Sequence, residues 1–427
     1  MTLRPPQYRP RLLDPVISRL LASVGAVSVE GPRWCGKTWA SLNQAESAFF
    51  VADPAGGFRN REVAQLDPSA VLDGASPRVI DEWQEAPGLW DAVRFTVDQR
   101  PGKGHFILTG SSTPADDAVI HSGAGRIARI RMRPMTLPES GDAKTQVSLS
   151  DLLTGEKPIP TAMGTFTLTQ IADLVVRGGW PGTLSLGPDQ AAQVLETYLE
   201  ASARTDISTI DTSRRDPAKM TALIRSLARN TATTATQATL RRDMANHFDA
   251  TLSETTLRHY LAILHRLYLI EEIPAWEPAL RSPIRLRQSP KRILADPSLA
   301  AVALSATPEH LIAEPKTLGF LFENLVLRDL LVYAHVLGGS LHHYRDSTDL
   351  EADAILTLPQ GDWAAFEIKL GHPQIDNAAA TLLRLAEKIT AAGHRPPRAL
   401  AVIVGTGAFS HVRDDGVTVI PIDALGN

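Results

Sequence analysis

The chain has 427 residues, which is more than one ordinary hydrophobic core supports, so we expect two to four domains. Charged residues make up 21% and the formal net charge is -4, so only a local cluster of charge would indicate nucleic-acid binding. The single cysteine, Cys35, excludes an internal disulfide. The sequence shows no signal peptide and no apolar stretch long enough to span a bilayer, so we expect a cytoplasmic protein without membrane association.

Strands and helices alternate along the first 150 residues. Short apolar runs predict strands at residues 26–29, 48–52, 78–80, 105–108 and 127–132. Apolar residues at helical spacing predict helices at residues 11–23, 38–44 and 88–99. This alternation predicts an α/β domain with a parallel sheet that is covered on both faces.

The first strand leads into residues 31–38, which fit the phosphate-binding pattern G-x-x-x-x-G-K-S/T in full. In such a loop, glycines let backbone N–H groups curl around phosphates, Lys37 reaches the β- and γ-phosphates, and the Thr38 hydroxyl ligates magnesium. The following helix offers its positive end to the phosphates. The sequence therefore predicts ATP and Mg²⁺ as cofactors, with a binding loop made of Gly31, Pro32, Arg33, Trp34, Cys35, Gly36, Lys37 and Thr38. For Cys35 itself, a residue merely tolerated in the loop is favoured over a redox role.

Two further strands end in residues suited to hydrolysis. The strand at residues 78–80 delivers Asp81 and Glu82, where Asp81 would hold magnesium and Glu82 would polarise the attacking water. The alternative is an ordinary strand with a capped exit. The strand at residues 105–108 ends in hydroxyls, so Thr109 and Ser111 are candidates to sense the γ-phosphate, with a plain polar strand end as an equal alternative.

Phosphoryl transfer also uses an arginine near the γ-phosphate. The candidates are Arg126, Arg129 and Arg177. Strand alternation puts Arg129, Arg131 and Arg133 on one face, which a solvated sheet edge explains equally well, so the sequence does not select one of them.

Residues 151–215 are expected to form a connecting helical segment, with a helix at residues 191–203. Residues 216–300 show three helical patterns, beginning at Asp216-Pro217, followed by a strand at residues 269–273, and this order predicts a winged helix. Its third helix would meet either DNA or protein through its early exposed positions Thr255, Thr256, Arg258 and His259. A basic stretch follows, which either contacts a phosphate backbone or forms a solvated loop: Arg281, Arg285, Arg287, Lys291 and Arg292.

The C-terminal residues 301–427 contain Glu323 on an apolar helix, then Asp353, then Glu367-Ile368-Lys369. This is the order of the PD-(D/E)XK nuclease site. The two-residue period of a strand places Glu367 and Lys369 on one face. Asp353 and Glu367 could share a divalent ion, and Lys369 could orient or deprotonate water. We expect these three side chains to converge at one edge of a small sheet, with Glu323 approaching from the helix. The alternatives are a nuclease-like fold without activity or an ordinary ion pair.

Taken together, these motifs resemble the prokaryotic predicted AAA-type ATPases whose C-terminal half was long catalogued as a domain of unknown function. The resemblance covers nearly the whole chain and rests on residues 8–13, 31–38, 80–84, 108–111, 125–126, 178–181, 206–207, 296, 322–324 and 367–369. It implies an ATPase core, a winged helix and a nuclease-like C-terminal domain, without an established substrate. The sequence departs from the family at Trp34-Cys35 and at Trp39, which leaves the roles of Lys37 and Thr38 intact.

We therefore predict an α/β chain with an AAA-type P-loop ATPase core at residues 1–150, the helical segment at 151–215, a winged helix at 216–300 and a restriction-endonuclease-like domain at 301–427. The favoured function is an ATPase that acts on, or is regulated by, nucleic acid, with DNA favoured over RNA. Its C-terminal domain is expected to be nuclease-like, with metal-dependent cleavage left open. One alternative is an ATP-gated switch that recruits a partner without cleavage, and another is ATP hydrolysis with a structural tail. A homo-oligomer is left open. The predicted catalytic residues are Glu82, Lys37 and Lys369, and the predicted metal ligands are Thr38, Asp81, Glu323, Asp353 and Glu367.

Overall fold

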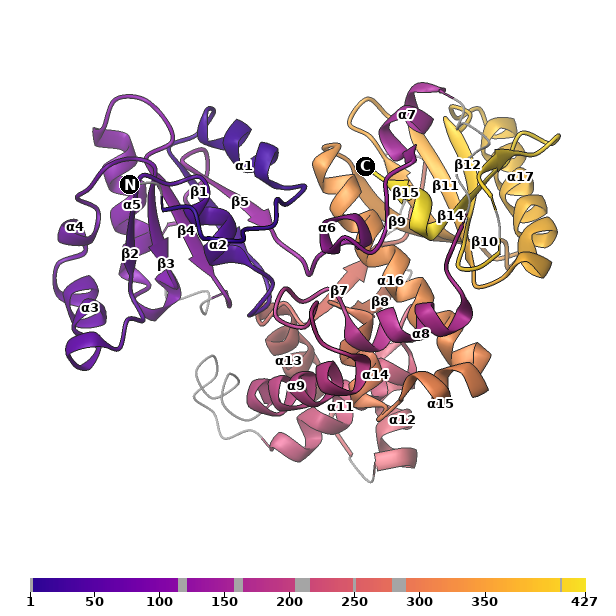
Figure 1. The fold of residues 1–427 in the computed structure, drawn as a ribbon, viewed down its shortest axis with the longest axis horizontal. Coiled ribbons are helices and arrows are strands. Elements are labelled where there is room, and N and C mark those ends of the chain that lie inside the picture. Colours follow the sequence, from indigo (N-terminus) through magenta and orange to yellow (C-terminus); the bar gives the residue numbers. More distant parts are fainter. Residues whose placement is uncertain are drawn as a thin grey trace. The chain divides into compact units, whose positions relative to one another are not determined.

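The computed structural model describes residues 3–113, 121–156, 164–203, 216–248, 251–278, 289–407 and 409–427. These residues form two compact units (Figure 1). The first unit contains the residues up to Pro134 together with residues 262–269, and the second contains the remainder from Met135 onwards. Within the described residues, no helix is both long and apolar enough to cross a membrane.

The first unit is built on a five-stranded parallel sheet with the strand order β2-β3-β4-β1-β5. Its strands are β1 (Ala26–Glu30), β2 (Ser47–Phe50), β3 (Arg78–Asp81), β4 (Phe106–Gly110) and β5 (Ile127–Arg131). All five strands expected from the sequence are present, and the predicted parallel α/β sheet is confirmed. Strand β4, which ends in the sensor candidates, lies between β1 and β3.

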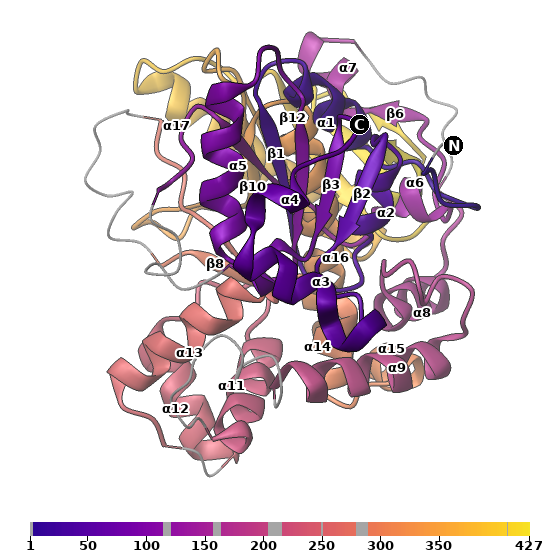
Figure 2. The same ribbon diagram turned by 90° about the vertical axis from the view of Figure 1, so that its left-hand side faces the viewer.

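Helices cover this sheet (Figure 2). They are α1 (Asp14–Leu21), α2 (Lys37–Leu42), α3 (Ala55–Leu66), α4 (Pro68–Val71), the 3-10 turn η1 (Trp83–Glu85) and α5 (Gly88–Gln99). A buried cluster joins α3, α4 and α5 to strand residues such as Ile80 and Phe106, while α1 and α2 pack on β1. Helix α3 was not expected, because it opens with Gly56, Gly57 and Phe58 in left-handed conformations and carries a weak apolar period.

The middle of the chain belongs largely to the second unit. Its helices are α6 (Leu137–Ser140), α7 (Leu149–Thr154), α8 (Leu168–Arg177), α9 (Pro188–Ala201), α11 (Pro217–Arg229), α12 (Gln237–Phe248), α13 (Glu254–Arg266), α14 (Pro297–Ala303) and α15 (Pro308–Ala313). Strands β7 (Ile270–Ile273) and β8 (Lys291–Leu294) form an antiparallel pair. The helix start predicted at Asp216 is confirmed, because its side chain accepts a hydrogen bond from the Ala218 N–H at 2.9 Å. Helices α11 to α13 followed by two strands give the element order of a winged helix, which stays a prediction.

The C-terminal part of the second unit is a six-stranded mixed sheet with the order β13-β14-β12-β11-β10-β9. Its strands are β9 (Ser340–Arg345), β10 (Glu351–Thr357), β11 (Trp363–Lys369), β12 (Ala399–Val404), β13 (His411–Val412) and β14 (Thr418–Pro421). Helices α16 (Pro315–Val336) and α17 (Ile375–Ala391) lie on opposite sides of the sheet (Figure 1). The last strand, β15 (Leu425–Gly426), pairs with β6 (Val147–Ser148), and the short turns η4 (His372–Gln374) and η5 (Ile422–Ala424) complete the fold.

A buried ion cluster fixes α14 and α16 to each other. The Arg328 guanidinium lies 2.7 Å from a carboxylate oxygen of Asp296 and 2.7 Å from one of Asp329. Asp296 also caps α14 and accepts from the Gly179 N–H at 3.1 Å. A side chain at Gly179 would place Cβ 2.2 Å from the Met135 carbonyl oxygen, so this contact requires glycine. The family motifs at residues 178–181 and 296 therefore meet in the second unit, where they serve packing.

Candidate functional site

The loop of residues 31–38 connects β1 to α2 and is curled around a lysine. At Gly31, an added Cβ would lie 2.1 Å from the Met132 carbonyl oxygen, and Gly36 has a φ of 100°, so both positions favour glycine. The Lys37 side chain is 5% exposed, and its ammonium donates to the Pro32 carbonyl oxygen at 2.9 Å. The phosphate-binding loop is thus preformed around its cation.

Asp81 lies at the end of β3 and joins the loop to the neighbouring strand. Its Oδ1 accepts hydrogen bonds from the hydroxyls of Thr38 and Thr109, each at 2.7 Å. Burial raises the pKa of Asp81, and the two hydroxyl donors only partly oppose that effect. A buried carboxylate beside a threonine hydroxyl is a set of oxygen ligands that suits Mg²⁺. Thr38 and Asp81 therefore fit the predicted metal.

Glu82 follows Asp81 and has a left-handed backbone conformation, with a φ of 57°. Its N–H donates to the Thr109 hydroxyl at 3.1 Å, and its carboxylate accepts from the Ser111 hydroxyl at 2.9 Å and from the Gln84 amide. Both sensor candidates therefore contact the two acids, and their response to a γ-phosphate stays a prediction. Gln84 was missed as a site residue, and the only signal for it is its position inside the family motif at residues 80–84.

Each of the three candidate arginines has an acidic partner. Arg126 lies 3.0 Å from Asp98, and Arg129 lies 3.5 Å from Glu30 and stacks on the Trp90 ring at 4.5 Å. Arg177 belongs to the second unit, where it donates to an Asp142 oxygen at 3.0 Å. These contacts do not distinguish one arginine as the residue that would reach a γ-phosphate.

The arginine face predicted for the fifth strand needs a correction. Arg129 is exposed and Ile130 is buried, as expected for alternation along β5. The strand ends at Arg131, however, and Arg133 beyond it is buried. Its carbonyl oxygen accepts from Arg11 at 2.8 Å. Arg133 is therefore not part of a solvated edge.

Cys35 belongs to the loop of residues 31–38, and Tyr268 contacts the strand that leads into it. Cys35 is fully buried, which favours a packing role because reactive thiols need access to solvent. The Tyr268 hydroxyl lies 2.9 Å from a Glu30 carboxylate oxygen and 2.7 Å from the Thr113 hydroxyl. Tyr268 thus links the end of β1 to the segment after β4. No sequence pattern indicates this link, since Tyr268 opens an apolar run.

The predicted convergence in the C-terminal domain is confirmed. Residues 354–357 of β10 pair with residues 363–366 of β11. The two strands separate beyond the pair formed by Ala354 and Phe366. At the fork, an Asp353 oxygen accepts from the Ile368 N–H at 2.8 Å. The Lys369 ammonium lies 3.2 Å from Asp353 and 2.5 Å from Glu367, so both carboxylates face one point.

Glu323 reaches this cluster through a lysine that was not predicted as a site residue. The Lys291 ammonium lies 2.5 Å from a Glu323 oxygen and 3.5 Å from an Asp353 oxygen. Among the described residues, no group of three or more histidine, cysteine or acidic side chains is arranged to hold a metal ion. Lys291 stands between Glu323 and Asp353, whereas Asp353 and Glu367 face each other across Lys369, and the three-carboxylate ligand set stays a prediction.

The cluster concentrates negative charge on one acid. Burial raises the pKa of Glu323 to about 7. Burial, reinforced by the Asp353 charge, raises the pKa of Glu367 to about 8. Burial acts against the charge of Asp353 as well, but the ammonium groups of Lys291 and Lys369 outweigh it and lower the pKa of Asp353. Asp353 is therefore the group whose negative charge the fold stabilises.

The basic stretch is corrected at its two described members. Lys291 is 1% exposed, and Arg292 is buried and pairs with Glu272 at 2.7 Å, so neither forms a solvated loop or a phosphate-binding surface. Arg281, Arg285 and Arg287 lie outside the described residues. On α13, the predicted buried stripe is confirmed at Leu257, Leu261 and Leu264. Of the four positions predicted to be exposed, Thr255, Arg258 and His259 are exposed and Thr256 is half-buried.

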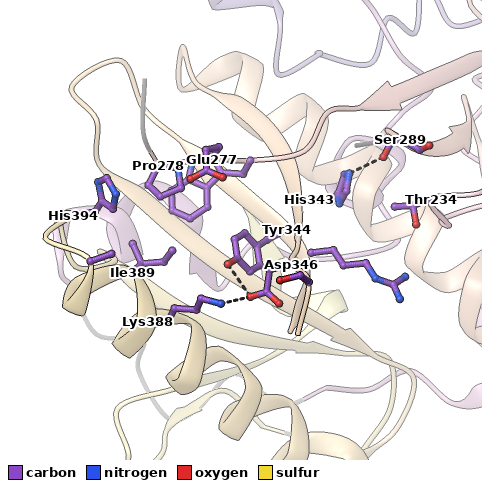
Figure 3. A pocket seen from close by; sticks show the side chains of 14 residues that line it. Thr234, Glu277, Pro278, Ser289, His343, Tyr344, Asp346, Lys388, Ile389 and His394 are labelled. Atoms are coloured by element: carbon purple, nitrogen blue, oxygen red, sulfur yellow. Dashed lines mark hydrogen bonds and ion pairs between the residues drawn. The ribbon is translucent and has the colours of Figure 1, made fainter. Parts of the chain in front are cut away.

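A separate cleft of about 690 Å³ lies beside β9 and α17 (Figure 3). Its lining includes Trp276, Tyr344, Asp346 and Lys388. The Lys388 ammonium lies 2.6 Å from Asp346, which also accepts from the Tyr344 hydroxyl at 3.1 Å. None of the predicted site residues lines this cleft.

Residues 24–140 match the family model of an AAA domain. The matched segment contains the loop of residues 31–38 and all five strands of the parallel sheet. Residues 168–310 and 318–425 match two further models, each described as a domain of unknown function (DUF8612 and DUF4143). Most of the chain is also similar to two mycobacterial proteins. These are the uncharacterized proteins Rv2008c of Mycobacterium tuberculosis and Mb2031c of Mycobacterium bovis, each 25% identical over 362 residues that cover 83% of this chain and 72% of theirs.

Two solved structures are also similar, at a low level. The Walker-type ATPase PABY2304 of Pyrococcus abyssi has a TM-score of 0.39 and 13% identity, covering 71% of this chain and 99% of the other. The Orc1 protein of Aeropyrum pernix, solved in complex with DNA, has a TM-score of 0.25 and 12% identity, covering 73% of this chain and 97% of the other. These scores are too low to establish a shared overall fold.

Proposed function

We propose that this chain binds ATP with Mg²⁺ at residues 31–38 and hydrolyses it. The observation that carries the proposal is the hydrogen-bonded series at the ends of β3 and β4. In that series Thr38 and Thr109 share one oxygen of Asp81, and Ser111 holds the carboxylate of Glu82. The acids are thus held by neutral donors, next to a loop whose lysine is already in place.

Each residue has a distinct role in the proposed reaction. Lys37 would bind the β- and γ-phosphates, and Thr38 and Asp81 would hold Mg²⁺, which neutralises charge on the phosphates. Glu82 would polarise the water that attacks the γ-phosphorus. Thr109 and Ser111 would respond to the γ-phosphate, because any change in their hydroxyl contacts alters the position of Asp81 or Glu82.

Nucleotide binding is tested by calorimetry with ATP and Mg²⁺. Lys37→Ala removes the charge that compensates the phosphates and should abolish tight binding. Lys103→Ala, at an exposed lysine of the same domain, is the matched control and should bind like the unmodified chain. Equal affinity in the Lys37 variant and the control would refute the proposal.

A second function, metal-dependent phosphodiester hydrolysis, is favoured by the C-terminal cluster. Asp353 and Glu367 both contact the Lys369 ammonium, so their carboxylates are close enough to share one divalent ion. Lys369 would then orient or deprotonate a water beside the scissile phosphate. The competing proposal is an ATP-gated switch in which this domain recruits a partner without cutting it.

We also propose nucleic acid as the partner, with DNA favoured over RNA, and a domain layout with a winged helix at residues 216–300. Support comes from the start of α13, where Thr255, Arg258 and His259 are exposed. The burial of Lys291 and Arg292 removes part of the charge argument for a phosphate partner. The exposed face of α13 is therefore what remains to support it.

Cleavage is tested on single- and double-stranded DNA and RNA with Mg²⁺ or Mn²⁺, with and without ATP. Metal-dependent cutting that is lost in Asp353→Asn would support the nuclease. Asp414→Asn, at an exposed aspartate of the same domain, is the control. Binding without cutting would favour the switch, whereas neither binding nor cutting would leave the domain without a nucleic-acid role.

A further inference from the structure

Strand β8 delivers a lysine into the C-terminal cluster from a different family segment. Lys291 lies within the segment at residues 168–310, whereas Glu323, Asp353, Glu367 and Lys369 lie within the segment at residues 318–425. The nuclease-like centre is therefore composite. The C-terminal segment by itself supplies only one of the two ammonium groups at this centre, that of Lys369.

The Lys291 ammonium is surrounded by oxygen. It lies 2.5 Å from the Glu323 carboxylate, 3.3 Å from the Asp353 carbonyl oxygen and 3.5 Å from the Asp353 carboxylate. The side chain is 1% exposed, so water contributes little to its solvation. An ammonium has three donors and no acceptor, and here three oxygens face it. A cation between two acids is in the position that a divalent ion bridging them would take.

The segment that follows β7 and the segment that precedes β8 are both fixed to β9. The His343 N–H donates to the Pro274 carbonyl oxygen at 3.0 Å, and the Trp276 N–H donates to the His343 carbonyl oxygen at 2.7 Å. The His343 ring Nε2 lies 3.2 Å from the Ser289 carbonyl oxygen, as Figure 3 shows. Ser289 is two residues before Lys291. The lysine is thus held on a frame that is tied to the sheet carrying the acids.

We propose that Lys291 is a built-in cation that neutralises Glu323 and Asp353 and limits this centre to one divalent ion, held by Asp353 and Glu367. The inference rests on the proposed metal site of this domain. A second divalent ion between Glu323 and Asp353 would have to displace the ammonium or approach it closely, and repulsion between buried like charges is strong. Lys291 is a positioning residue, because it acts through the two acids.

Removing the ammonium should open a second place for metal. The test is calorimetric titration of the full chain with MnCl₂ in the absence of nucleotide, with Asp353→Asn as the subtraction for binding elsewhere. The unmodified chain should bind one Mn²⁺ at the cluster. Lys291→Met frees Glu323, so it should bind a second Mn²⁺ or bind the first at least about tenfold more tightly. The double variant Lys291→Met/Glu323→Gln should return to one ion, because it removes the Glu323 carboxylate that would hold the second.

Thermal melting keeps the test valid if Lys291→Met is unstable. Without the ammonium, two buried acids repel each other, and Mn²⁺ should replace the lost charge. The rise in melting temperature on adding MnCl₂ should therefore be larger in Lys291→Met than in the unmodified chain. The double variant removes both the ammonium and the Glu323 carboxylate. Its rise in melting temperature on adding MnCl₂ should therefore be smaller than that of Lys291→Met.

The outcomes separate this inference from the proposed nuclease. Two ions at the cluster of the unmodified chain, or unchanged Mn²⁺ binding in Lys291→Met, would overturn the role of Lys291. No ion in the unmodified chain but one in Lys291→Met would support Lys291 as the resident cation and would refute the metal-dependent nuclease. No Mn²⁺ binding in either protein would overturn both.

Discussion

The carboxylates of Asp81 and Glu82 accept from hydroxyl and amide groups, whereas those of Asp353 and Glu367 in the C-terminal cluster contact ammonium groups. Asp353 also accepts from the Ile368 N–H. Among the described residues, no cationic side chain forms an ion pair with the first pair. The second pair is largely neutralised by two lysines. Both pairs follow a strand pattern that indicates metal chemistry, yet the donors around them differ. The comparison teaches that the charge of the contacting groups, more than the presence of paired acids, distinguishes a site built for an external cation.

The largest expected effect is on ATP turnover. Glu82→Gln keeps the shape of the side chain and its contact with Ser111 but loses the carboxylate that polarises water. Turnover should fall about a hundredfold or more while ATP still binds. The measurements are phosphate release and calorimetry on the same preparation. Glu85→Gln in the adjacent turn is the control, and a normal rate in Glu82→Gln would move the catalytic role to another residue.

The second prediction compares one aspartate from each site. Asp353→Asn removes the charge that the buried Lys291 and the half-buried Lys369 both contact, and should lower the free energy of unfolding by about 3 kcal/mol. Asp81→Asn should leave the stability of the nucleotide-free chain unchanged or slightly higher. Burial raises the pKa of Asp81, which means that its charge is unfavourable in the fold.

Melting temperatures measured without nucleotide or metal check this pair of variants. Asp414→Asn, at an exposed position, should match the unmodified chain. Equal destabilisation by Asp81→Asn and Asp353→Asn would show that the two acid sites are electrostatically alike. The comparison would then fail.

Most of the AAA-type domain could be predicted from the sequence, because its signals are local. The loop of residues 31–38 and the strands before Asp81 and Thr109 can each be recognised from a few consecutive residues.

Two helices that were not predicted differ in their sequence signals. Helix α8 of the second unit was missed although it is amphipathic and begins with a capping box at Thr167. Helix α3 could not be predicted, since its first residues adopt left-handed conformations that no apolar period signals.

The C-terminal cluster could be predicted only where its residues share an element order. Asp353, Glu367 and Lys369 lie on neighbouring strands, so the two-residue period and strand pairing bring them together. Lys291 could not be placed, because it stands among other basic residues and its partner Glu323 is far away in the sequence. A lysine at the start of a short apolar strand gives the same local pattern whether it is solvated or buried. Only the tertiary contact distinguishes the two.

The smallest expected effect is on acid stability and concerns His343, which anchors the segment before Lys291. Burial, together with the positive charge of Lys291, lowers the pKa of His343 to about 4, and His342 and Arg345 act in the same direction. In the unfolded chain a histidine titrates near its ordinary pKa of about 6.5. Between these values the unfolded state binds more protons, so stability rises with pH through this window and is lost as the pH falls from about 6.5 towards 4.

His343→Gln should flatten this pH dependence. The glutamine amide can still donate to the Ser289 carbonyl oxygen but cannot take up a proton. Between pH 7 and pH 5, the unmodified chain should lose about 1–2 kcal/mol more stability than the variant. The measurement is the melting temperature of each protein as a function of pH. His372→Gln, at an exposed histidine, is the control. If both histidine variants follow the acid profile of the unmodified chain, the charge of the cluster does not reach His343, and the frame that holds Lys291 is not sensitive to protons.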